Sequence, residues 1–201
     1  IQPRTWAPKE PWAPAVIARN GKYYFYFSAN HYLGVAVSDR PAGPFKDAVG
    51  RTLYNRWDGI DPMPFLDDDG QAYLYFGGGP DGTGANARVI RLNPDMVSLM
   101  DAAATVIPAP DFFEASFLHK RDGKYYFSYS TGFTNHPPSI DYMVSDNPMT
   151  GFSYAGTVLP NPAGNNDNNN HSSIVQYEGS WYIFYHDRVL ANRDGFTSFQ
   201  R

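Results

Sequence analysis

Four copies of one aromatic hairpin pattern constrain the fold of this chain more than any other feature. In each copy, a turn that contains glycine directly precedes a stretch rich in tyrosine and phenylalanine; the turn glycines are Gly21, Gly70, Gly123 and Gly179. Successive glycines are therefore 49, 53 and 56 residues apart. A repeat of about 50 residues that carries several strands is typical of a β-propeller, in which each repeat folds into one blade.

The sequence between the hairpins predicts further strands in each unit. Residues 35–45 and 142–152 are similar to each other: an alternating strand leads into a Ser-Asp turn with a nearby proline. Residues 88–95 occupy the same place in the second unit. We therefore expect an all-β chain in which residues 1–201 form a single propeller domain of about four blades, with an incomplete last blade. The best helix candidate is the short segment 97–104, which lies between two prolines.

Charge and composition argue against several functional classes. The net charge is -4 and the 16 basic residues are scattered, so we expect no nucleic-acid partner and no membrane partner. No apolar run approaches the roughly 18 residues that a membrane span needs. The absence of cysteine excludes disulfides and thiolate metal sites, and it leaves the localisation open. An aromatic content of 16% supplies rings that could stack on sugars.

Chemically distinctive residues recur at one position of the repeat. Nine residues before the turn glycine stand Trp12, Asp61 and Glu114. In the fourth unit strict counting gives Asn170, whereas local similarity gives His171 if that turn is one residue shorter. The first strand of every blade lines the axis of a propeller, so we predict that these side chains meet at one end of the central channel.

Glu114 is the strongest catalytic candidate. Three phenylalanines lie within three residues of it, and a carboxyl that is partly removed from water has a raised pKa. Such a group can stay protonated near neutral pH, as a general acid requires. The alternative is a paired or edge-exposed carboxylate. Asp61 precedes Pro62 and could equally cap a turn.

Three motifs at blade spacing resemble the blade starts of glycoside hydrolase family 43. They are residues 12–14 (Trp-Ala-Pro), 58–62 (Asp-Gly-Ile-Asp-Pro) and 113–116 (Phe-Glu-Ala-Ser), and residues 171–174 with 182–186 are similar to a later part of that family. The resemblance covers nearly all 201 residues. It implies an inverting five-bladed β-propeller enzyme, of the α-L-arabinofuranosidase or β-xylosidase type. Its substrates would be arabinoxylan, arabinan or xylo-oligosaccharides.

The resemblance also implies roles for individual residues. Glu114 would be the general acid, and Asp61 would raise its pKa and orient it. His171 would lie on the axis, where many members of the family hold a calcium ion or a water, although calcium prefers oxygen donors. The remaining candidates are substrate-binding residues, each of which has an alternative role in the core or on the surface: Trp12, Phe113, Arg188 and His31.

The general base of this family is an aspartate on the first strand of a preceding blade, ahead of the Trp-Ala-Pro motif. None of residues 1–11 is an aspartate, so we expect a first blade, and the base with it, to lie outside this chain; the alternative is a four-blade remnant with only half the catalytic apparatus. Two alternatives stay open. The first is a non-catalytic carbohydrate-binding propeller, which keeps the aromatic platforms without a complete acid–base pair. The second is a protein-interaction propeller, which the two carboxylates at the same repeat position do not support.

Overall fold

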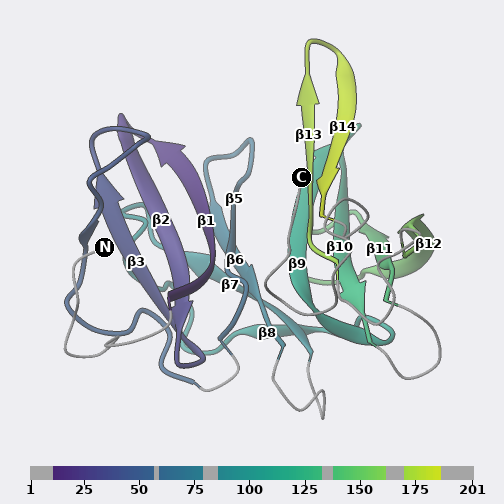
Figure 1. Ribbon diagram of the computed structural model, residues 1–201, viewed down its shortest axis with the longest axis horizontal. Helices are drawn as coiled ribbons and strands as arrows, with labels where there is room; N and C mark the ends of the chain where they lie inside the picture. Colours follow the sequence, from purple (N-terminus) through teal and green to yellow (C-terminus); the bar gives the residue numbers. More distant parts are fainter. Residues whose placement is uncertain (1–10, 57–58, 79–85, 133–137, 162–169, 187–201) are drawn as a thin grey trace, which may run out of the picture.

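A computed structural model of the chain describes residues 11–56, 59–78, 86–132, 138–161 and 170–186. In this part of the chain the strands form three four-stranded antiparallel sheets and one two-stranded sheet (Figure 1). The all-β prediction is therefore confirmed. The helix prediction for residues 97–104 is wrong, because this segment consists of bends closed by a bridge between Leu92 and Leu99. No helix long and apolar enough to cross a membrane occurs among the described residues.

Each sheet corresponds to one sequence repeat, and we number the sheets as blades 1 to 4. Blade 1 contains β1 (Pro11–Arg19), β2 (Lys22–Ala29), β3 (Tyr32–Ser38) and β4 (Lys46–Asp47). Blade 2 contains β5 (Met63–Leu66), β6 (Ala72–Phe76), β7 (Ala87–Leu92) and β8 (Thr105–Ile107). Blade 3 contains β9 (Phe112–Arg121), β10 (Lys124–Thr131), β11 (Ile140–Ser145) and β12 (Ser153–Leu159). The described part of blade 4 contains β13 (Ser172–Tyr177) and β14 (Ser180–Tyr185).

Turn chemistry sets the register of the hairpins. In blade 3, Arg121 pairs with Lys124 across a two-residue turn, and the turn residues Asp122 and Gly123 have φ values of 49° and 76°. Positive φ at both positions matches the twist of the flanking strands, and Asp-Gly tolerates it. Blades 1 and 4 have the same two-residue turn, whereas blade 2 has a longer turn between Leu66 and Ala72.

The blades stack face to face, which explains why the aromatic strands are apolar on both sides. Every residue of β6 is buried. Its residue Leu74 packs in one core cluster with Tyr26 of blade 1. The next residue, Tyr75, points to the opposite face and lies 6.0 Å from Phe127 of blade 3 between ring centroids. Because successive side chains alternate between the two faces, a strand held between two layers needs apolar residues at every position.

Blade 4 contacts blade 3 on one face only in the described residues. The ring of Trp181 lies 5.1 Å from that of His119. On the opposite face of this hairpin, large apolar side chains are 45–63% exposed: Val175, Tyr177, Tyr182 and Phe184. In Figure 1 the same hairpin, drawn in yellow, extends beyond the other sheets.

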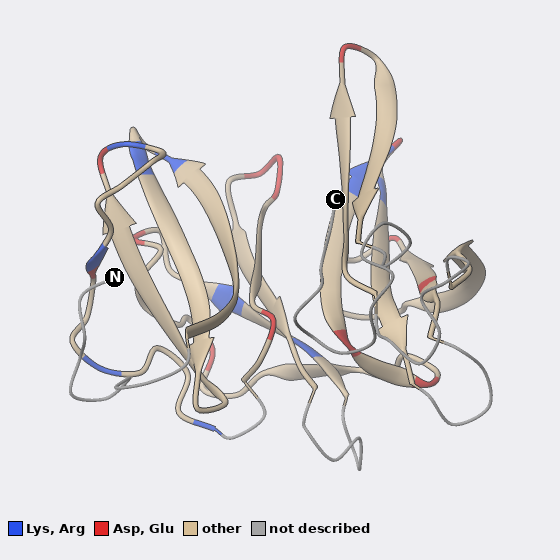
Figure 2. Cartoon of the chain, in the orientation of Figure 1, with Lys and Arg blue, Asp and Glu red and all other residues tan. Residues whose placement is uncertain are grey.

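The first strands of the blades follow one another around a common axis. β1 contacts β5, β5 contacts β9, and β9 contacts β13. Figure 2 shows Lys, Arg, Asp and Glu spread over turns and strand ends of the described residues, with no continuous stripe of one sign. The starts of the first strands are therefore the place where residues far apart in the sequence come together.

The interface between blades 1 and 2 gives a test of this packing. We expect Leu74→Ala to lower the free energy of unfolding by about 2–5 kcal/mol, because it removes a fully buried side chain and leaves a cavity. The matched control is Val106→Ala in β8, where the side chain is 47% exposed and the expected loss is within about 0.5 kcal/mol. Urea unfolding measures both, and equal losses would contradict the face-to-face packing.

Candidate active site

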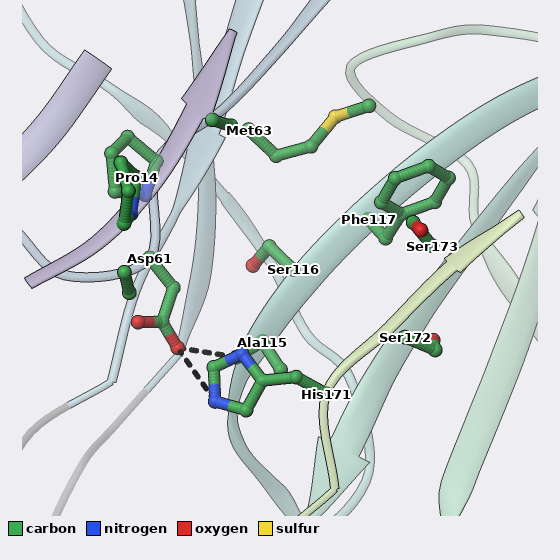
Figure 3. Close-up of a pocket in the computed structure, with 12 residues that line it drawn as sticks. Pro14, Asp61, Met63, Ala115, Ser116, Phe117, His171, Ser172 and Ser173 are labelled. Atoms are coloured by element: carbon green, nitrogen blue, oxygen red, sulfur yellow. Dashed lines mark hydrogen bonds and ion pairs between the residues drawn. The ribbon is translucent and has the colours of Figure 1, made fainter. Parts of the chain in front are cut away.

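A pocket of about 190 Å³ lies where the first strands meet. Each of the four blades contributes three consecutive lining residues, namely 13–15, 61–63, 115–117 and 171–173 (Figure 3). These four stretches start at or directly after the repeat position that the sequence singled out. The structure therefore brings the first strands of all four blades together at one pocket, although Trp12 and Glu114 are not themselves among its lining residues.

A β-bulge follows the key position in blades 1 and 3. In each case two residues of the first strand face one of the second between the flanking pairs, which are Trp12–Ser28 with Ala15–Tyr26, and Glu114–Ser130 with Phe117–Ser128. The residue directly after Trp12 or Glu114 is an alanine with positive φ, 40° at Ala13 and 62° at Ala115. Bulges next to functional sites commonly redirect side chains and stop regular pairing.

The two residues before Asp61 are held by backbone hydrogen bonds to blades 1 and 2. The Gly59 N–H donates to the carbonyl of His31 in blade 1 over 2.9 Å, and the Gly77 N–H in blade 2 donates to the carbonyl of Ile60 over 3.0 Å. Asp61 itself has φ of 51°, an uncommon value for a residue other than glycine. The segment that carries this carboxylate is thus fixed to two sheets and locally strained.

The bulge in blade 3 supplies the third attachment. The Ala115 N–H donates to Oδ2 of Asp61 over 2.8 Å, a buried contact between residues 54 positions apart. The other carboxylate oxygen, Oδ1, is buried and has no hydrogen-bond partner among the described residues. Asp61 is only 6% exposed, so this carboxylate has almost no contact with solvent.

His171 completes a three-residue cluster with the two carboxyl groups. Its Nε2 lies 3.1 Å from Oε1 of Glu114 and 3.8 Å from Oδ2 of Asp61. Figure 3 shows the Asp61 carboxylate directed at the His171 ring. The side chain of Glu114 is 14% exposed against 5% for Asp61, so Glu114 keeps more access to the outside.

Burial and mutual charge determine the protonation of this cluster. Burial raises the pKa of Asp61 to about 6; the nearby Glu114 adds to the rise, while His171 opposes it. For His171 burial acts to lower the pKa, but Asp61 and then Glu114 outweigh it and raise the pKa to about 9. At neutral pH the cluster therefore holds an imidazolium between two carboxyl groups.

Calcium is a poor fit to these three residues. One donor atom from each lies within 4.8 Å of the others, close enough for a shared cation. However, calcium takes six to eight oxygen ligands, and this set offers two carboxylates and a ring nitrogen. A cation bound there would have to displace the proton of His171, because an imidazole binds a metal in its neutral form. The metal role of His171 stays a prediction and enters no step below.

The other candidate residues lie away from the pocket lining or outside the described structure. Trp12 is 57% exposed, and its carbonyl accepts a hydrogen bond from Ser28. Phe113 is half-buried directly before Glu114, and His31 lies in the turn between β2 and β3. Arg188 falls outside the described residues. Their substrate-binding roles stay predictions.

Sequence reasoning missed the lining residues that follow the key position. Ser116 is 5% exposed, and its hydroxyl has no partner among the described residues. The signal was present, because the pocket takes the same stretch of every repeat. In blade 4 the structure brings His171, rather than Asn170, to the carboxylates. The turns of blades 3 and 4 have equal length, so the one-residue offset comes from the bulge at Ala115.

Comparison with known proteins identifies relatives over the whole chain. The model of "Glycosyl hydrolases family 43" matches residues 2–201. A β-xylosidase of Xylanibacter ruminicola is 38% identical over 96% of this chain and 70% of its own length. An arabinoxylan arabinofuranohydrolase of Paenibacillus polymyxa is 40% identical over 92% of this chain and 34% of its own length.

A solved structure has the same arrangement of strands. The α-L-arabinofuranosidase of Clostridium thermocellum matches with a TM-score of 0.83 and 45% identity, over 96% of this chain and 66% of that chain. The chain thus spans between about a third and 70% of the length of these three proteins.

The charge of His171 predicts how stability depends on pH. Its pKa is raised by folding, so the stability that it contributes is complete below pH 6.5 and is lost as the pH rises through about 9. The raised pKa of Asp61 changes the stability at lower pH, between 3.8 and about 6, and so lies outside this alkaline interval. We expect the melting temperature to fall over this alkaline interval, and the fall to be smaller in His171→Gln.

The matched control is His119→Gln in β9. Burial, and then Arg121, lower the pKa of His119 to about 4, so this ring is neutral throughout the interval. This variant should keep the wild-type slope of melting temperature against pH. A wild-type slope in His171→Gln would mean that His171 is not the titrating group.

Proposed function

Because the chain belongs to family 43 of the glycosyl hydrolases, we propose that it carries the general acid of a glycosidase acting on arabinofuranosyl or xylosyl linkages of plant polysaccharides. The observation that carries the proposal is the cluster of Asp61, Glu114 and His171, one residue from each of three blades; Asp61 and His171 also line the axial pocket. The names of the relatives, β-xylosidase and arabinoxylan arabinofuranohydrolase, support this substrate class.

Glu114 is the residue that donates the proton. It is the more exposed of the two carboxyl groups, and a general acid has to reach the glycosidic oxygen. As the bond between the anomeric carbon and this oxygen breaks, the proton of Glu114 passes to the oxygen, and the leaving sugar departs as a neutral alcohol. A water adds to the anomeric carbon and gives its proton to the base.

Asp61 positions the acid and is not the base. An inverting glycosidase needs about 6.5–9.5 Å between its two carboxyl groups to accommodate the water. Donor atoms of Asp61 and Glu114 lie within 4.8 Å of each other, which leaves no room for it. Moreover, Asp61 is buried, and its Oδ2 accepts the Ala115 N–H. We place the base outside the described residues.

Removal of the acid should have an effect that depends on the leaving group. We expect Glu114→Gln to lower kcat/KM at least ~100-fold on xylo- or arabino-oligosaccharides, whose leaving sugar needs the proton. The loss should be much smaller on nitrophenyl glycosides, because nitrophenolate leaves without protonation. The control is Glu178→Gln in the exposed turn of blade 4, which should behave as wild type. Kinetics on both substrate types, with the full-length protein, measure this.

Two results would overturn the acid role of Glu114. One is unchanged activity on oligosaccharides in Glu114→Gln. The other is an equal loss on both kinds of substrate, as expected of a residue needed only for folding or binding. If the wild-type protein binds arabinoxylan in calorimetry without any turnover, the carbohydrate-binding alternative replaces this proposal; the exposed Trp12 would suit that role.

The anomeric configuration of the first product tests the role of Asp61. With the base at a distance, water attacks the face opposite the leaving group, so the released pentose should have inverted configuration. Proton NMR recorded within the first minutes distinguishes the two anomers. Retention would instead make Asp61 a nucleophile, because retaining enzymes hold their carboxyl groups about 5–5.5 Å apart.

A further inference from the structure

Two consecutive glycines end the second strand of blade 2 beside the site. Gly77 and Gly78 follow β6 directly and have φ values of 139° and 128°, which residues with side chains rarely adopt. Position 77 lies seven residues after the turn glycine, where blades 1 and 3 carry Ser28 and Ser130. The glycine pair is therefore a feature of blade 2 and not of the repeat.

Gly78 lies between the two segments that carry the carboxylates. A Cβ atom at this position would be 2.8 Å from the carbonyl oxygen of Phe113 and 2.7 Å from Cδ1 of Ile60. Carbon atoms essentially never come this close to such neighbours, so one of the two would have to move. Phe113 directly precedes Glu114, and Ile60 directly precedes Asp61.

The two neighbours differ in how easily they can move. Cδ1 of Ile60 is the end of a flexible side chain and can rotate away at little cost. The Phe113 carbonyl belongs to the planar peptide group that joins Phe113 to Glu114, so its displacement also moves the backbone of Glu114. The hydrogen bond between the adjacent Ala115 N–H and Asp61 would be strained by the same movement.

We propose that Gly78 is a positioning residue for the acid: the absence of a side chain there lets the peptide before Glu114 lie close to the segment that carries Asp61. The contact of Glu114 with His171 at 3.1 Å depends on this approach. The effect on catalysis rests on the function proposed above, whereas the effect on the backbone does not. Gly78 itself does not touch the reacting atoms in this proposal.

A second glycine provides a matched control. Gly156 in β12 has φ of 133°, close to that of Gly78, but the nearest atom to its added Cβ would be Cε1 of Tyr142 at 3.7 Å, an ordinary contact. Gly156→Ala therefore introduces similar backbone strain without a clash. Comparison of Gly78→Ala with Gly156→Ala separates displacement of the Glu114 peptide from the general cost of a side chain at positive φ.

The experiment measures kcat, KM and the pH profile of both variants on xylo- and arabino-oligosaccharides, in the full-length protein. We expect Gly78→Ala to lower kcat about 10- to 100-fold, because a misplacement of about 1 Å has effects of this order, with KM nearly unchanged. The pH profile should shift as well, since the carboxyl groups interact. Gly156→Ala should stay within about twofold of wild type. Equal losses in the two variants, or a wild-type kcat and pH profile in Gly78→Ala, would refute the positioning role.

A double variant identifies which neighbour is displaced. Ile60→Ala removes Cδ1 and Cγ1, the two Ile60 atoms 2.7 and 3.0 Å from the added Cβ, but leaves the contact with the Phe113 carbonyl, so it should not restore kcat in the Gly78→Ala background. Full restoration would place the displacement on Ile60 and overturn the proposal.

Backbone amide chemical shifts of residues 113–115 make the result independent of activity. In Gly78→Ala these shifts should change, and in Gly156→Ala they should not. If they change while Glu114→Gln is fully active, the proposed function fails and the displacement of the Glu114 peptide stands. If the shifts stay at their wild-type values, the positioning role fails by itself.

Discussion

The hydrogen bond from the Ala115 N–H to the Asp61 carboxylate joins two blades at the axis, and the arrangement of the site depends on it. A buried carboxylate is costly unless hydrogen bonds and an opposite charge compensate the lost hydration. Here the bulge provides the N–H, and His171 provides the charge. The pKa of Asp61 is nevertheless raised to about 6, because burial outweighs both. The pKa values of Asp61 and His171 therefore depend on each other and on the nearby Glu114, so this part of the site behaves as one unit that spans three blades.

The stacked blades make such a unit possible. Asp61 and His171 are 110 positions apart in the sequence, yet their donor atoms lie within 4.8 Å. No local turn could achieve this; it results from sheets that pack through faces dominated by rings and aliphatic side chains. Interiors of this density have few alternative arrangements, so the first strands keep their relative positions. A site built on rigid strands is held more accurately than one built on loops. In such a packed site, a side chain added at Gly78 would disturb the close approach of its backbone to Phe113.

Much of this architecture was predictable because its causes are local. The Asp122-Gly123 turn and the alternation of aromatic residues define strands and register within a few residues, and the repeat then predicts which positions share the axis. The bulge at Ala115 was not predictable, since an extra residue in a strand has no turn chemistry to mark it. For the same reason strict counting pointed to Asn170 instead of His171. The register also places the backbone without giving the direction of a side chain: Trp12 shares the repeat position of Glu114, but Trp12 is 57% exposed, whereas Glu114 contacts His171. At residues 97–104 the pairing of Leu99 with Leu92 outweighed a weak local preference for helix.

The two carboxyl groups are chemically alike, and their surroundings give them different roles. Asp61 has lost nearly all contact with solvent, and one of its oxygens accepts a backbone N–H, which suits the positioning role proposed for it. Glu114 contacts the same imidazole from the more exposed side and keeps a route to the outside. When two titratable groups lie in unequal environments, one can serve as the acid and the other as its electrostatic partner. In this chain the difference arises from a single bulge: Glu114, the proposed acid, directly precedes it, and the Ala115 N–H within it holds the buried Asp61.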